Sequence, residues 1–94
     1  MSKSIRTQQN EVFLALLRDR REALGLRQAD LAERLGQTQA TVSRVETGET
    51  RLDIIELRTW LQALNVSFLA FMKQLDTKLD DRAASIGVLG RSSR

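Results

Sequence analysis

The 94-residue sequence predicts an all-α domain of five helices, and three observations lead to this prediction. The chain has no proline and no cysteine, and aromatic residues make up only 4% of it, which suits a helical bundle better than a β-sandwich or barrel. Apolar residues recur at helical spacing in separate stretches, and glycine or polar turn residues divide those stretches. A chain of this length is long enough for one well-buried core and too short for two.

The first helix is predicted to begin at Asn10 and to be stopped by Gly25, a typical residue just after a helix. Residues 1–9 are polar and include two basic side chains, so we expect them to form a flexible basic arm. The apolar face of this helix comprises Phe13, Leu17 and Leu24, with Leu14 and Leu16 beside it.

Two short helices follow, and a glycine ends each of them. The amphipathic segment Gln28–Leu35 is about two turns long and is closed by Gly36. Thr38 is a good N-cap for the next helix, Gln39–Glu46, which Gly48 ends. The side chains expected to be buried are Leu31, Ala32 and Leu35 in the former helix and Val42 and Val45 in the latter.

Capping residues also mark the last two helices. Asp53 and Glu56 have the spacing of a capping box and predict a fourth helix through Leu64, whereas Ser67 can cap a fifth helix over residues 67–80. Their apolar stripes are Ile54, Leu57, Leu61 and Leu64, and Phe68, Met72, Leu75 and Leu79. The helical domain is thus expected to span residues 10–84, and residues 85–94 to form a flexible tail.

The net charge and isoelectric point of this chain give only weak evidence about its partners. The isoelectric point of about 10.2 is high, but the formal net charge is only +3. Because the sequence has no His, Cys or Tyr, few groups titrate between the carboxylates and the lysines, and a small excess of arginine raises the isoelectric point strongly. No apolar run approaches the roughly 20 residues of a membrane span, and the N-terminus lacks the apolar core of a signal peptide. We therefore expect a cytoplasmic protein that is not bound to a membrane.

The segment GLRQADLAERLGQTQATVSRVETGE joins two short helices through a glycine-containing turn. It closely resembles the helix-turn-helix of the Cro/C1-type (XRE) repressor family, and the resemblance extends from about Phe13 to Leu69. The positions that carry it are Gly25, Leu26, Gln28, Leu31, Ala32, Leu35, Gly36, Gln39, Val42, Glu46 and Gly48. The resemblance implies a lambda-repressor-like domain with the helix-turn-helix at the second and third helices. It also implies a regulator that binds double-stranded DNA. We expect a repressor, because the chain has no room for a separate ligand-sensing or polymerase-contacting domain. We expect a homodimer on a palindromic operator, because one helix-turn-helix offers too few contacts for tight specific binding.

The third predicted helix carries side chains suited to reading bases. A recognition helix presents hydrogen-bonding groups to base edges while its opposite face stays packed. Gln39 can pair bidentately with adenine and Arg44 with guanine, and each such pair contributes about 1–3 kcal/mol of discrimination. Ala40 can contact a thymine methyl group. The resemblance places these three residues at base-reading positions, with Thr41 close by; a merely solvated polar face is the alternative.

Five residues are predicted to contact DNA phosphates: Gln28, Thr38, Ser43, Arg51 and Arg27. Gln28 and Thr38 lie at helix starts, where backbone N–H groups and the helix dipole favour an anion, and each has a capping role as its alternative. The arginines could instead be solvated surface residues. Arg27 stands where the family usually has a capping Ser or Thr, so we expect Arg27→Ser to raise the melting temperature.

Charged or large apolar residues at other positions predict contacts within or between chains. Arg21 and Glu46 occupy inward-facing positions, and in the family the matching pair forms an internal salt bridge, so we assign them a structural role.

Five apolar residues of the last two helices are predicted to form a dimer interface, with extra core packing as the alternative: Trp60, Phe68, Phe71, Met72 and Leu75.

Two other functions remain open at this point. The chain could be the antitoxin of a toxin-antitoxin pair that grips a protein partner from Phe68 onward, or a restriction-modification controller protein. An enzyme is disfavoured because there is no His or Cys and the carboxylates are scattered. No cofactor and no metal site are expected.

Overall fold

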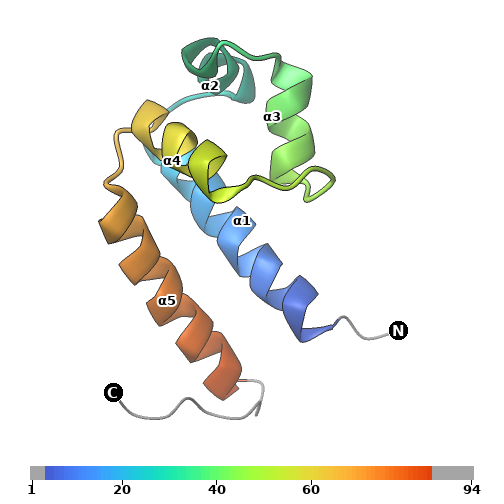
Figure 1. Ribbon diagram of the computed structural model, residues 1–94, viewed down its shortest axis with the longest axis vertical. Helices are drawn as coiled ribbons and strands as arrows, with labels where there is room; N and C mark the ends of the chain where they lie inside the picture. Colours follow the sequence, from blue (N-terminus) through green and yellow to red (C-terminus); the bar gives the residue numbers. More distant parts are fainter. Residues whose placement is uncertain (1–3, 86–94) are drawn as a thin grey trace.

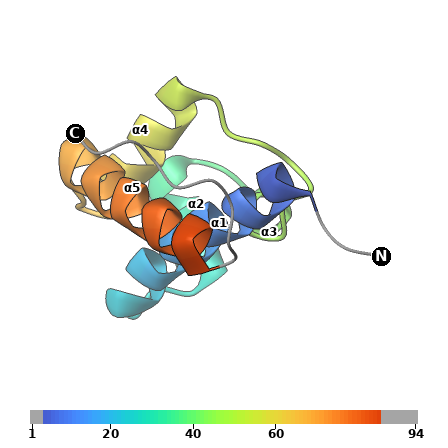
Figure 2. The ribbon, with the colours of Figure 1, turned by 90° about the horizontal axis from the view of Figure 1, so that it is seen from below.

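The computed structural model describes residues 4–85, which form five α-helices joined by short loops (Figure 1). The helices are α1 (Ile5–Ala23), α2 (Gln28–Leu35), α3 (Gln39–Glu46), α4 (Ile54–Ala63) and α5 (Phe68–Ser85). The long helices α1 and α5 pack against each other, and the short helices α2 and α3 lie near one end of this pair (Figures 1 and 2). The predicted all-α class, with the helix-turn-helix at the second and third helices, is confirmed.

The first helix begins earlier than predicted, at Ile5 rather than at Asn10. Ser4 has the extended backbone of an N-cap, with φ −67° and ψ 160°, and its Oγ accepts a hydrogen bond from the Thr7 amide at 3.1 Å. The prediction of a flexible arm is therefore wrong for residues 5–9, because a capping serine starts the helix although its first turns have no apolar face. The rest of the predicted arm, at residues 1–3, lies outside the described residues.

The last helix continues beyond its predicted end at residue 80, as far as Ser85. The sequence between Phe68 and Ser85 contains no glycine and no proline, so nothing in it stops the helix. Ser85 thus belongs to α5 and not to the predicted tail, and residues 86–94 lie outside the described part of the chain.

The predicted helix signals are present at the other ends. The three glycines expected to close helices all have positive φ: Gly25, Gly36 and Gly48. Asn65 takes the same role after α4 with φ 59°, as asparagine tolerates this conformation best among the non-glycine residues. At the start of α4, the Glu56 amide donates to Asp53 Oδ1 at 2.7 Å and the Asp53 amide donates to Glu56 Oε1 at 2.8 Å, which completes the predicted capping box.

The core contains two of the five apolar side chains assigned above to a dimer interface. Trp60 is 1% exposed and Phe71 is fully buried, with the Phe71 ring edge-on to Phe13 at 6.1 Å. The prediction that these two residues form a dimer interface is wrong, because packing of α5 on α1 turns Phe71 inward and leaves neither side chain a surface to offer a second chain.

The other predicted interface residues, Phe68, Met72 and Leu75, are half-buried and pack against the edge of the core. Their role in a dimer stays a prediction. Among the side chains that the structure describes, the large apolar ones that are exposed are Leu24, Ile54, Ile55 and Leu69. Leu24 and Ile54 were expected on buried stripes, but they lie at helix ends and are exposed.

Candidate nucleic-acid interface

The helices α2 and α3 form a packed unit around the three-residue turn 36–38. Leu31 and Ala32 of α2 and Val42 and Val45 of α3 are all buried, as predicted. These contacts fix one face of α3 against the body of the domain, so the opposite face is directed away from it.

That outward face carries the side chains predicted to contact bases. Gln39, Ala40 and Arg44 are exposed, and Thr41 is half-buried. Ser43, predicted to contact phosphate, is also half-buried. The structure therefore brings all five residues onto one short helix. Their contacts with DNA stay predictions.

Thr38 is the N-cap of α3, as predicted. Thr38 has φ −94° and ψ 156°, and its hydroxyl oxygen accepts a hydrogen bond from the Thr41 amide at 3.2 Å. The two threonine hydroxyls lie 2.9 Å apart. The Thr38 hydroxyl caps α3. Because Thr38 is exposed, the same hydroxyl is also accessible for the predicted contact with a DNA phosphate.

Behind the outward face lies a buried ion pair between Arg21 and Glu46. Arg21 donates from Nε to Glu46 Oε2 at 2.6 Å and from Nη2 to Oε1 at 2.9 Å, and it also donates from Nη1 to the Leu26 carbonyl at 2.7 Å. The hydrogen bond to Glu46 raises the pKa of the Arg21 guanidinium above its ordinary value. The internal salt bridge implied by the family resemblance is thus present, and it ties α1 to α3.

Gln28, the first residue of α2, connects this ion pair to the outward face. Its Nε2 donates to Glu46 Oε1 at 3.0 Å, and its Oε1 accepts from Gln39 Nε2 at 2.7 Å. Gln28 was predicted to contact a phosphate, and its two partners inside the protein were not predicted. The sequence feature that could have revealed these partners is a glutamine at the start of each of the two short helices, together with the inward-facing Glu46.

Arg27 occupies the N-cap position of α2, but its side chain makes no capping hydrogen bond. Its guanidinium instead pairs with Asp30, from Nε to Oδ2 at 3.0 Å and from Nη2 to Oδ1 at 2.9 Å. This pairing lowers the pKa of Asp30 to about 2. The Arg27 side chain is 81% exposed, so its predicted contact with a phosphate remains sterically open.

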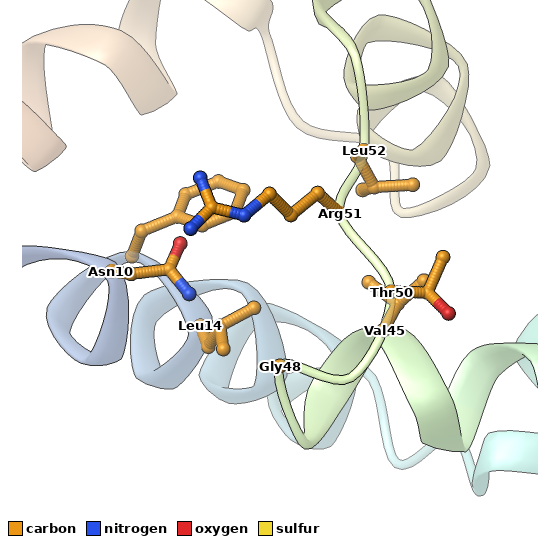
Figure 3. Close-up of a pocket in the computed structure, with 8 residues that line it drawn as sticks. Asn10, Leu14, Val45, Gly48, Thr50, Arg51 and Leu52 are labelled. Atoms are coloured by element: carbon orange, nitrogen blue, oxygen red, sulfur yellow. The ribbon is translucent and has the colours of Figure 1, made fainter. Parts of the chain in front are cut away.

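Arg51 lies in the loop between α3 and α4, and its side chain is turned back across a small pocket toward Asn10 of α1 (Figure 3). The pocket has a volume of about 100 Å³ and is lined by Asn10, Phe13, Leu14, Val45, Gly48, Thr50, Arg51 and Leu52. Arg51 is exposed, and its contact with a phosphate stays a prediction.

Two short packed helices, the second with an exposed polar face, define a helix-turn-helix DNA-binding domain. The sequence matches the Helix-turn-helix family over residues 17–71. The solved structure of an XRE-family like protein from Pseudomonas syringae pv. tomato str. DC3000 is similar, with a TM-score of 0.73 and 34% identity over 79% of this chain and 92% of that one. No curated protein matches the chain. The chain belongs to the Cro/C1-type (XRE) helix-turn-helix family and is a DNA-binding transcription regulator.

This family consists of DNA-binding regulators and is not a class of enzymes. Within residues 4–85, no cluster of acidic side chains has the arrangement needed to hold a metal ion. None of the described helices is long and apolar enough to span a bilayer.

Proposed function

We propose that this regulator binds a palindromic operator in double-stranded DNA as a homodimer and represses transcription. The observation that best supports the proposal is the division of α3 into two faces. Val42 and Val45 hold the helix to the core, while Gln39 and Arg44 are exposed. A helix held in this way can enter the major groove without disturbing the domain that carries it.

In this proposal Gln39 and Arg44 hydrogen-bond to base edges, with Ala40 and Thr41 beside them. Arg44 Nε lies 3.8 Å from Glu49 Oε2, and both side chains are largely exposed. Exposed ion pairs contribute only about 0–1 kcal/mol, so the guanidinium can leave Glu49 for a guanine at little cost.

The phosphate contacts of the proposal lie around the base-reading side chains. Thr38 stands at the start of α3, and Arg27 stands at the start of α2, both at helix N-termini that favour an anion. Gln28, Ser43 and Arg51 complete the set. Each positive side chain that replaces a counterion makes binding more sensitive to salt.

A homodimer is proposed because one recognition helix offers few base contacts, whereas two related by two-fold symmetry read half-sites about 34 Å apart. Apolar surface for a second copy is present on the last two helices, where Ile54, Ile55 and Leu69 are exposed. Phe68, Met72 and Leu75 are half-buried on α5. A dimer bound over a promoter excludes polymerase by occupying the same DNA.

The test is selection of binding sites from a random duplex pool, followed by binding measurements with Gln39→Ala and Arg44→Ala at fixed salt. We expect a palindrome to be enriched, and each variant to lose about 1–3 kcal/mol of discrimination at one base pair per half-site. Gln62→Ala and Arg58→Ala are matched controls, since they change the same residue types on the exposed side of α4.

Two further measurements cover the rest of the proposal. Sedimentation equilibrium should give a dimer, and a reporter placed behind the selected operator should be expressed less when the protein is present. Failure to enrich any site would refute the operator-binding proposal and would favour a protein partner, such as a toxin. A protein that stays monomeric when bound would refute the dimer.

A further inference from the structure

We propose that Glu49, in the loop after α3, is a specificity-determining residue whose carboxylate holds the Arg44 guanidinium so that its two terminal nitrogens meet a guanine. The inference rests on the proposed base-reading role of Arg44. Glu49 acts as a positioning residue, because it pairs with the arginine and does not touch the base.

The turn that ends α3 places Glu49 beside Arg44. Gly48 has φ 85°, and its amide donates to the Val45 carbonyl at 3.0 Å. The Glu49 amide donates to the Arg44 carbonyl at 2.9 Å. These two hydrogen bonds form a Schellman motif, in which the residue after the glycine lies next to the third-last residue of the helix. The Thr50 amide also donates to the Arg44 carbonyl, at 3.0 Å, so the backbone fixes the relative position of the two residues.

The side chains at these two positions form an ion pair. A Schellman motif frequently brings apolar side chains together here, whereas in this chain Arg44 Nε lies 3.8 Å from Glu49 Oε2. The two side chains are 52% and 69% exposed, so packing does not hold either of them. The carboxylate is therefore the group best placed to restrain the guanidinium before DNA is bound.

This restraint leaves the correct part of Arg44 for a base. A guanidinium can donate in pairs from a side edge, formed by Nε and one terminal nitrogen, or from an end edge, formed by Nη1 and Nη2. The carboxylate of Glu49 approaches at Nε, on the side edge, and leaves the end edge for DNA. Guanine presents two acceptors, N7 and O6, which the two N–H groups of the end edge match. The ion pair can open at little cost, but this contact does not require it to open.

The carboxylate of Glu49 by itself favours neither the helix nor a complex with DNA. A negative charge at a helix C-terminus is unfavourable, because the helix dipole already places partial negative charge there. DNA phosphates repel the same charge. An exposed ion pair offsets only a small part of these costs. Control of the Arg44 side chain explains an acidic residue at this position better than stability or affinity does.

The restraint favours guanine over the other bases. An unrestrained arginine can turn sideways and use single acceptors, such as a phosphate oxygen or N7 of adenine. Arg44 held at Nε loses less rotamer freedom when its end edge binds a guanine. Contacts that need a different orientation gain nothing from the restraint, so the preference for guanine increases.

The test compares wild type with Glu49→Asp and Glu49→Gln on four duplexes that differ only at the base pair at which Arg44→Ala loses its preference. Aspartate keeps the charge but is one methylene shorter, so its carboxylate draws back from Arg44 Nε. Glutamine keeps the length and loses the charge. We expect both variants to reduce the ratio of guanine affinity to that of the other bases by about 3-fold. Only Glu49→Gln should bind all four duplexes more tightly, because it alone removes the repulsion from phosphates.

Two controls separate positioning from charge and from stability. Glu33→Gln removes the same charge at an exposed glutamate of α2 and should keep the wild-type ratio. In the Arg44→Ala background, Glu49→Gln should leave the ratio unchanged, because no guanidinium remains to be held. The melting temperature of Glu49→Gln should stay close to that of wild type, since the lost ion pair and the charge removed from the helix end offset each other.

Each remaining outcome refutes a definite part of the reasoning. If wild type and both Glu49 variants share one ratio, the positioning role is refuted and the proposed function stands. A ratio that falls in Glu49→Gln alone would assign the effect to charge and would also refute positioning. If Arg44→Ala keeps the wild-type preference at every base pair, the base-reading role of Arg44 is refuted, and the role of Glu49 with it.

Discussion

Arg27→Ser is expected to stabilise the domain by completing the N-cap of α2. The backbone of Arg27, with φ −78° and ψ 166°, is close to that of Thr38, whose hydroxyl accepts a hydrogen bond from an amide three residues ahead. A serine at position 27 therefore fits without strain and can accept from the Asp30 amide. The Asp30 carboxylate already accepts from the amide of residue 27 at 2.8 Å, so the substitution completes a capping box.

The net gain is the difference between two small contributions. A capping hydroxyl stabilises a helix by about 1 kcal/mol. The substitution also removes the ion pair between Arg27 and Asp30, and such exposed pairs typically contribute about 0.2–1 kcal/mol. The expected net gain is about 0.5 kcal/mol, which corresponds to a rise of about 2–4 °C in the melting temperature of a domain of this size.

Thermal denaturation followed by circular dichroism measures this gain. Arg27→Ala is the control, because it removes the same ion pair and adds no capping oxygen, so it should melt below wild type. The difference between the serine and alanine variants isolates the cap at about 1 kcal/mol. A serine variant that melts no higher than the alanine variant would refute the capping argument.

Three other substitutions test separate parts of the structure. Pairing with Arg27 holds the pKa of Asp30 at about 2, below its ordinary 3.8, so this carboxylate contributes stability that is present above about pH 4 and lost as the pH falls toward 2. The melting-temperature difference between wild type and Asp30→Asn should accordingly be constant from about pH 5 to 7 and vanish near pH 2. Gly48→Ala should lower the free energy of unfolding, measured by urea denaturation, by more than the roughly 1 kcal/mol expected for Gly36→Ala. Both glycines have positive φ, but only a Cβ at Gly48 meets a side-chain atom, at 3.3 Å. Equal losses in the two variants would contradict this close approach. Phe71→Ala should cost about 3–5 kcal/mol in the same assay, and a loss under 1 kcal/mol would mean that Phe71 is not in the core.

The ends of α2 and α3 could be predicted to the residue because local chemistry decides them. Thr38 caps one helix, and Gly36 ends the other with a positive φ. The start of α1 was missed because the apolar pattern begins only after its first turns, and Ser4 alone marks the helix start.

Tertiary contacts explain the larger errors. Phe71 was predicted to form a dimer interface together with Phe68, Met72 and Leu75, but it contacts Phe13 on α1 and is fully buried. No helical periodicity within α5 contains that information, since the choice depends on how another helix lies against it.

In the candidate site, too, some features could be predicted from the sequence and others depend on tertiary contacts. The residues on the outward face of α3 could be predicted from helical spacing and from family resemblance. The hydrogen bonds from Arg21 and Gln28 to Glu46 and from Gln39 to Gln28 could not, because they join three helices and depend on which polar partner each side chain finds. The direction of the Arg51 side chain, toward Asn10 of α1, could not be predicted either (Figure 3).

The close spacing of α2 and α3 along the chain has a consequence for the order of folding. Their contacts close only a short loop, whereas the hydrogen bond from Arg20 to Gln74, which joins α1 to α5, links residues 54 positions apart. Because closing a longer loop costs more chain entropy, we expect α2 and α3 to associate before α5 docks. Folding kinetics of Val42→Ala and Phe71→Ala would then give the higher φ-value at Val42. The part of the domain proposed to read DNA would take shape while the helix that completes its core is still free.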